Sequence, residues 1–161
     1  MKNSILRRTA FAVIILSITC ALLSLTACGT ALGSVKSMLK RKYNIKLPSD
    51  TEMVYCLYES KDSWFGDGVD YFVFKFKKEP TGVIENFTSL NLKEDENPNE
   101  LKVELIAFFD SAISMADDKI PQKYLPDWDE EMTWQYGGQV AGLSAVYYPE
   151  RMEMIICKVT I

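Results

Sequence analysis

Catalytic chemistry in this chain would have to come from carboxylates and cysteines, because its 161 residues include no histidine. Ser-His and Cys-His nucleophilic pairs and His-dependent metal sites are therefore excluded. The acids around Trp128 (Asp127, Asp129, Glu130 and Glu131) are the carboxylates that come closest to an acid–base pair. Such pairs can hydrolyse glycosides, but a charge run on one loop is more typical of a solvated surface. We expect no catalytic residue and keep a small carboxylate hydrolase, based on Asp129 or Glu131, as an alternative.

The cysteines give a second set of reactive groups, at positions 20, 28, 56 and 157. No CxxC pair occurs, so we expect neither a structural metal site nor a cofactor. Cys56 and Cys157 fall in predicted strands and could form a disulfide outside the cytoplasm, closing a loop of about 100 residues worth ~4–5 kcal/mol. The alternative is two separate buried thiols that act as small hydrophobic side chains.

The N-terminus has the pattern of an export signal. Lys2, Arg7 and Arg8 precede an apolar run over residues 10–25, which is short for a membrane span. The run ends in Leu25-Thr26-Ala27-Cys28, which resembles the lipobox of bacterial prolipoproteins: an aliphatic residue, two small residues, then cysteine.

This resemblance implies that the Cys28 thiol receives a diacylglyceryl group and that cleavage falls between Ala27 and Cys28. A further acylation of the new amino terminus, commonly with palmitate, would follow in many bacteria. The resemblance thus predicts a signal peptide over 1–27 and a protein anchored to the cell membrane through Cys28, facing outside the cytoplasm. Two or three acyl chains give a durable anchor.

Charge is distributed unevenly along the rest of the chain. From Leu47 onward there are 22 acidic against 10 basic residues, a net charge of −12, which makes nucleic acid a poor partner. Five bases lie together just before Leu47, at positions 36, 40, 41, 42 and 46. They would either lie beside anionic lipid headgroups or form a solvated helix face.

Hydrophobic patterning predicts an α+β fold in a single domain over 47–161, preceded over 28–46 by a lipidated N-terminus, a tether and a short helix. Alternating apolar residues predict strands at 53–59, 69–77, 132–136, 143–148 and 152–161. One short helix is expected within 80–90, and the main helix over 97–116 begins with Asn97, Pro98 and Glu100, typical of a capped start. Short turns favour antiparallel pairing. We expect a five-stranded antiparallel sheet, built from a hairpin and a C-terminal three-strand meander, with the main helix on one face.

In the first strand, simple alternation places Val54, Cys56 and Tyr58 on one face and Met53, Tyr55 and Leu57 on the other. The order of the elements resembles small uncharacterised lipoproteins of Gram-positive bacteria, with Leu47-Pro48-Ser49-Asp50 entering this strand and Ile120-Pro121 to Trp128 joining the helix to the meander. That resemblance implies no activity.

The loop between the first two strands carries Trp64 and Phe65 among polar residues and glycines. Exposed aromatics of this kind often anchor a partner, although either ring could instead fold back over the sheet edge. Calcium coordination by Asp62, Asp67, Gly68 and Asp70 is a weaker alternative, because their spacing differs from an EF-hand loop.

The sequence therefore favours a membrane-anchored, non-enzymatic module that binds an envelope protein or a small ligand. An inhibitory or immunity-type partner of an envelope protein, acting through an acidic face, is the first alternative, and the hydrolase is the second.

Overall fold

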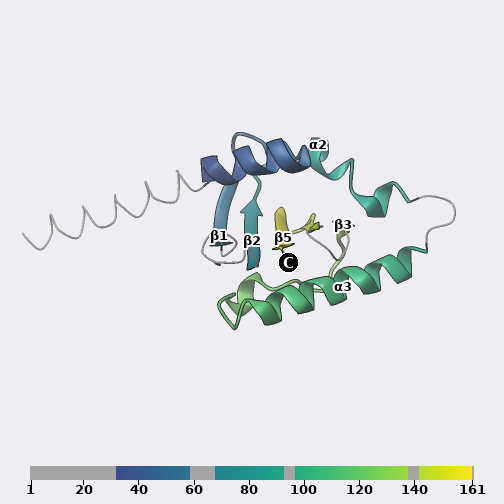
Figure 1. The fold of residues 1–161 in the computed structure, drawn as a ribbon. Helices are drawn as coiled ribbons and strands as arrows, with labels where there is room; N and C mark the ends of the chain where they lie inside the picture. Colours follow the sequence, from purple (N-terminus) through teal and green to yellow (C-terminus); the bar gives the residue numbers. More distant parts are fainter. Residues whose placement is uncertain (1–31, 59–67, 93–96, 138–141, 161) are drawn as a thin grey trace, which may run out of the picture.

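The computed structural model describes residues 32–58, 68–92, 97–137 and 142–160. Within them, a sheet lies between two helical layers (Figure 1). The basic helix (residues 32–43) and α2 (Thr81–Ile84) cover one face, and α3 (Pro98–Met115) covers the other. Cys28, Ala27 and the rest of the predicted signal peptide lie outside the described residues, as do Trp64 and Phe65.

The sheet has five antiparallel strands in the order β1-β2-β5-β4-β3. Their bounds are β1 Glu52–Tyr58, β2 Gly68–Lys75, β3 Thr133–Gln135, β4 Leu143–Tyr148 and β5 Glu153–Thr160. The β1–β2 hairpin and the β3–β4–β5 meander are joined through β2 and β5. This confirms the predicted α+β class and the five-stranded antiparallel sheet.

The main helix starts where its capping residues predicted. The Asn97 side chain accepts a hydrogen bond from the Asn99 backbone N–H at 3.0 Å and donates one to Glu100 at 3.2 Å. The first bond satisfies a backbone donor that a helix start leaves open, and the second joins two side chains of the cap. The helix ends at Met115, and Asp117 and Asp118 after it adopt positive φ angles of 50° and 58°. The single helix expected within 80–90 is instead two separate turns, α2 and the 3-10 turn η1 (Thr88–Leu90).

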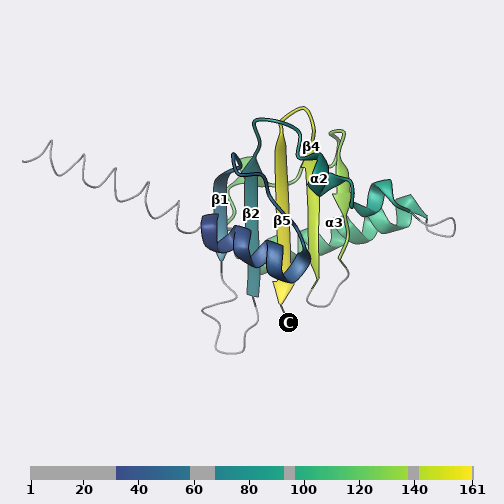
Figure 2. The same cartoon turned by 90° about the horizontal axis from the view of Figure 1, so that it is seen from above.

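Both faces of the sheet are buried, so the domain has two cores. The core under the basic helix contains Leu39, Phe72, Phe74 and Ile156, each with no exposed surface. Figure 2 shows this helix lying across β1, β2 and β5.

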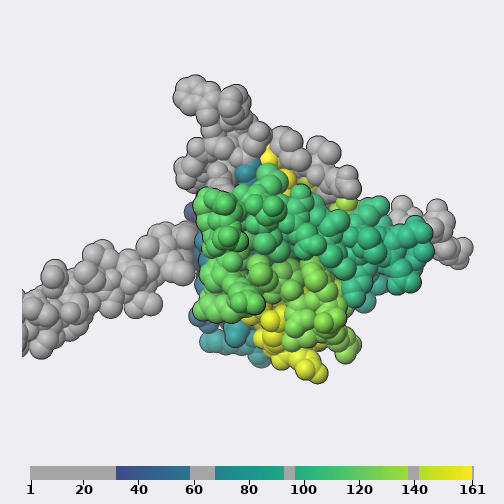
Figure 3. Space-filling model, turned by 90° about the horizontal axis from the view of Figure 1, so that it is seen from below, coloured from purple at the N-terminus to yellow at the C-terminus, as the bar shows by residue number. Residues whose placement is uncertain are grey.

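The core under α3 contains alternate residues of the same strands, including Tyr71, Val73, Ile155 and Cys157, together with Phe109 of the helix. Figure 3 shows α3 and the segment that follows it covering this second face.

The basic helix packs against the sheet with the rest of the domain, although it precedes Leu47, the residue at which the sequence predicts the folded domain to start. Val35 is 6% exposed, Leu39 0% and Ile45 7%. The chain leaves the helix through Asn44, which has a φ of 56°, and the Ile45 N–H donates to the Leu39 carbonyl at 3.2 Å. Asparagine tolerates this left-handed conformation better than most residues. The turn returns the chain to the same core.

The expected faces of β1 are wrong in part. The register against β2 shifts between Met53 and Tyr55, which is a β-bulge. Because a bulge inserts one extra residue, the alternation is interrupted there. Val54 and Tyr55 therefore both pack on the α3 side, whereas Met53 and Cys56 pack on the basic-helix side.

Candidate functional surfaces

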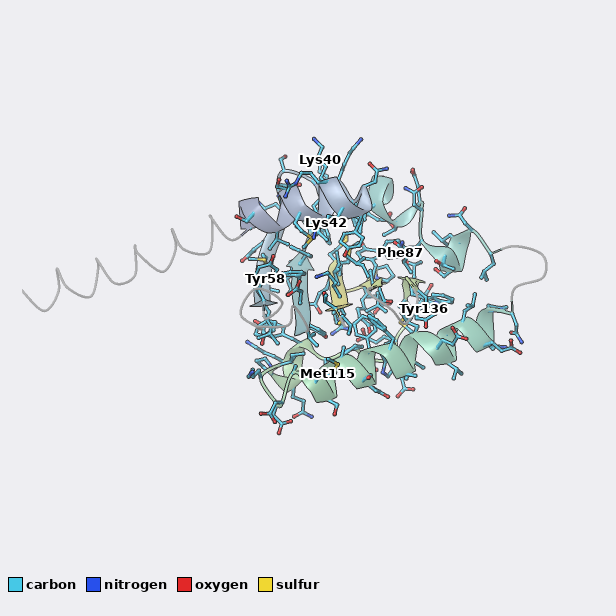
Figure 4. The ribbon with its side chains drawn as sticks, viewed as in Figure 1. Lys40, Lys42, Tyr58, Phe87, Met115 and Tyr136 are labelled. Atoms are coloured by element: carbon cyan, nitrogen blue, oxygen red, sulfur yellow. The ribbon has the colours of Figure 1, made fainter. Side chains whose placement is uncertain are left out.

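The basic surface consists of the side chains of Lys36, Lys40, Arg41, Lys42 and Lys46. All except the half-buried Lys36 are exposed. Figure 4 shows Lys40 on the outer side of the basic helix and Met115 in α3, on the opposite side of the sheet. Three of the bases occupy the last turn of the helix, where positive charge is favoured by the helix dipole. The local structure thus holds a group of cations on one outer layer of the domain.

A shallow hollow lies within the basic surface. Lys36, Ser37 and Lys40 line it from the helix, and Lys46 and Leu47 line it from the segment after the turn at Asn44. The Lys36 ammonium donates to the Pro48 carbonyl at 2.7 Å and to the Ser49 carbonyl at 3.3 Å. These bonds hold the segment against the helix. Lys40 and Lys46 remain exposed at the hollow.

A buried ion pair lies beneath the C-terminal end of the basic helix. Lys158 Nζ of β5 is 3.2 Å from Asp70 Oδ2 of β2, and the Asp70 side chain is only 1% exposed. Burial raises the pKa of the nearby Tyr43, an effect that the Lys158 charge opposes and the Asp70 charge reinforces. The pair neutralises two charges that would be costly to bury singly. This accounts for Asp70 as a structural residue, and of the other acids considered for calcium, Asp62 and Asp67 lie outside the described residues.

The acids around Trp128 contact groups of their own segment and of Arg151. Asp127 accepts a hydrogen bond from the Asp129 N–H at 3.1 Å, and Glu130 Oε2 lies 2.8 Å from Arg151 Nε. Trp128 packs edge-on against Phe109 of α3, with ring centroids 5.6 Å apart. The segment is therefore a cover for the second core with an acidic outer surface.

Arg151 links this acidic segment to the sheet. Its guanidinium lies 4.1 Å from the centre of the Tyr148 ring and 3.6 Å from Glu153 Oε1. The Tyr148 hydroxyl accepts a hydrogen bond from the Asp127 N–H at 2.9 Å. Burial raises the pKa of Tyr148 to about 12, although that hydrogen bond and the Arg151 charge both lower it. These contacts fix the Asp127–Glu131 segment on the sheet.

Cys56 and Cys157 lie on opposite faces of the sheet and form no disulfide with each other. Their strands are also not neighbours, because β2 lies between β1 and β5. Two strand spacings amount to about 9–10 Å, beyond the Cα separation that a disulfide spans. The bridge that the sequence allowed is therefore not formed, and burial raises the pKa of the Cys157 thiol.

The described residues contain no group of three or more carboxylate or thiol side chains placed to hold a metal ion. Among their helices, none has the length and apolar character needed to cross a bilayer.

Sequence reasoning missed the Asp70–Lys158 pair and the packing of the basic helix. A signal for each was present. Asp70 and Lys158 are charges with apolar residues on both sides in the sequence, and Leu32, Val35 and Leu39 recur at helical spacing. Comparison with known protein families, with characterised proteins and with solved structures gives no match for this chain.

Proposed function

We propose that the protein is a lipoprotein anchored through Cys28 outside the cytoplasm, and that its folded domain is a non-enzymatic binding module. The observation that carries the proposal is the Leu25-Thr26-Ala27-Cys28 motif directly after a short apolar run with a basic start. Small residues before the cysteine suit a protease site, and the thiol can form a thioether. The lipid bilayer is thus the first partner.

The roles of the buried polar groups support a binding module over an enzyme. Asp70 is engaged with Lys158, and the half-buried Arg151 joins Glu130 to Glu153. Polar groups of a binding or active site usually converge on a cleft, whereas these groups tie one structural element to another. The small carboxylate hydrolase stays a prediction, with Asp129 and Glu131 exposed on their loop.

An acidic outer face favours the second candidate, an inhibitory or immunity-type partner of an envelope protein. Glu100, Glu104 and Asp110 are exposed on α3, and the Asp127–Glu131 segment lies on the same side of the sheet. A basic partner would complement this face. Its binding should weaken steeply as salt rises, because exposed charges are screened. Binding that is independent of salt would contradict this candidate.

The test of the anchor is the intact mass of the protein extracted from membranes. The natural chain should begin at Cys28 and carry the mass of its acyl chains. Cys28→Ala should keep its leader and carry no acyl group, since the modified thiol is gone. Attachment alone is not decisive, because an uncleaved apolar leader also holds a protein to a membrane.

Cys20→Ala is the matched control, since it removes a cysteine of the leader outside the motif. It should be processed and acylated like the natural chain. An unmodified Cys28 in the mature protein would overturn the proposal.

A further inference from the structure

We propose that the basic surface docks the domain onto anionic phospholipid, with a headgroup phosphate seated in the hollow between Lys40 and Lys46. This inference rests on the proposed anchor at Cys28. It adds a second contact with the bilayer and gives the domain a defined orientation.

The charge of the basic surface is unbalanced locally. No acidic residue occurs before Asp50, and among the described residues no carboxylate pairs with Lys40, Arg41, Lys42 or Lys46. Ser37, Lys40 and Lys46 line one depression together with Lys36, whose ammonium is already engaged with the Pro48 and Ser49 carbonyls. Phosphate oxygens accept hydrogen bonds from several such donors at once. The chemistry of the hollow therefore fits a phosphate group.

The packing of the basic helix limits how far this surface can be from an anchored cysteine. Cys28 is only four residues before Leu32, where the helix starts. An extended chain spans at most ~3.5 Å per residue, so Cys28 lies within about 14 Å of Leu32. The helix rise of ~1.5 Å per residue places Lys40 about 12 Å further along. The field of charged headgroups decays over about 8–10 Å at physiological salt. An anchor at Cys28 would thus keep Lys40 within about 26 Å of the membrane surface at full extension, and a helix lying along the bilayer would bring the bases inside that field.

The opposite face would not compete for the bilayer. It carries the exposed acids of α3 and of the Asp127–Glu131 segment, which anionic headgroups repel. A sheet with a helical layer on each side separates the two faces by about 20 Å, or roughly two screening lengths. Each face therefore responds to its own surroundings, and docking would turn the acidic face outward.

The test is lysine acetylation of the full lipid-anchored chain, read residue by residue by mass spectrometry. The protein is reconstituted in vesicles of phosphatidylcholine alone and in vesicles with one third phosphatidylglycerol. A base near an anionic bilayer adds about five-fold to binding, so two bases add about 30-fold. Phosphatidylglycerol should lower the acetylation rates of Lys40 and Lys46 by five-fold or more. The exposed Lys77 and Lys78, beyond the end of β2, should be unchanged.

A matched pair of variants separates docking from general charge. Lys40→Gln/Lys46→Gln should abolish the phosphatidylglycerol-dependent protection of Lys42, whereas Lys77→Gln/Lys78→Gln should retain it. Lys36 is left intact because its ammonium holds Pro48 and Ser49.

Each outcome decides between the anchor and the docking. Flotation of the vesicles in a density gradient shows whether the protein is attached to them. If the protein floats with both vesicle types and its lysines are acetylated at equal rates, docking is overturned and the anchor stands. If it floats with phosphatidylglycerol vesicles alone, docking is supported and the anchor is contradicted, and if it floats with neither, both are contradicted. Inorganic phosphate added to phosphatidylcholine vesicles is the remaining arm of the test. If it slows the acetylation of Lys40 and Lys46 as much as phosphatidylglycerol does, the hollow is a site for free phosphate and docking to the bilayer is overturned.

Discussion

The packing of the basic helix against the sheet predicts that Leu39→Ala destabilises the whole domain. Leu39 has no exposed surface and lies in the core formed with Phe72, Phe74 and Ile156. Replacing an enclosed leucine by alanine loses transfer free energy and leaves a cavity, at a cost of about 3–5 kcal/mol. A loss of about 3 kcal/mol is the expected minimum here, because strands and helix enclose the side chain from both sides.

Urea unfolding in detergent micelles, followed by tryptophan fluorescence, measures this cost. Of the three tryptophans, Trp134 (6% exposed) and Trp128 both pack in the core on the other side of the sheet. A change in fluorescence therefore reports unfolding beyond the basic helix. With a slope of about 2 kcal/mol per molar urea, the midpoint should fall by about 1.5 M. Ser37→Ala, an exposed position in the same helix, should change the free energy of unfolding by less than about 0.5 kcal/mol.

A cost below about 1 kcal/mol for Leu39→Ala, similar to that of Ser37→Ala, would refute the reasoning. The helix would then be loosely attached. The chain between Cys28 and the domain would be longer than four residues, and the short reach from anchor to basic surface would no longer hold.

Three further outcomes follow from buried groups. Lys158→Met removes the cation beside the buried Asp70 carboxylate and should lower the free energy of unfolding by about 3–5 kcal/mol. Adding Asp70→Asn should recover part of the loss in the same denaturant titration, and a single-variant cost near zero would contradict a buried pair. The pKa of Tyr148 is raised to about 12 in the folded state, so the unfolded chain ionises at this residue first. The contribution of Tyr148 to the free energy of unfolding is therefore complete below about pH 10 and is lost towards pH 12. Tyr148→Phe should therefore flatten the alkaline fall in stability, and an unchanged slope would count against this origin. Without reductant, both Cys56 and Cys157 should be alkylated in denaturant, and Cys157 should resist alkylation in the native protein; a mass two hydrogens short would indicate a bridge instead.

Local patterns in the sequence determined the class of fold. The alternation in residues 69–77 and the start Asn97-Pro98 depend on the geometry of one strand or one helix, so they located β2 and α3 within a few residues. Short turns between apolar segments likewise predicted antiparallel pairing. The Leu25-Thr26-Ala27-Cys28 motif, on which the proposed anchor rests, is also local, since it lies in four consecutive residues.

Contacts between distant segments decided the rest. Strand order placed β2 between β1 and β5, and the bulge in β1 reset its faces, so Cys56 and Cys157 came to lie on opposite sides of the sheet. Neither effect has a periodic signature in the chain, because each depends on which strand becomes the neighbour. The same holds for Lys158, whose charge is tolerated only because β2 brings Asp70 beside it. The sequence by itself determined the local elements and the anchor motif, and only the tertiary structure decided which residues meet, since burial depends on the partner that each face acquires.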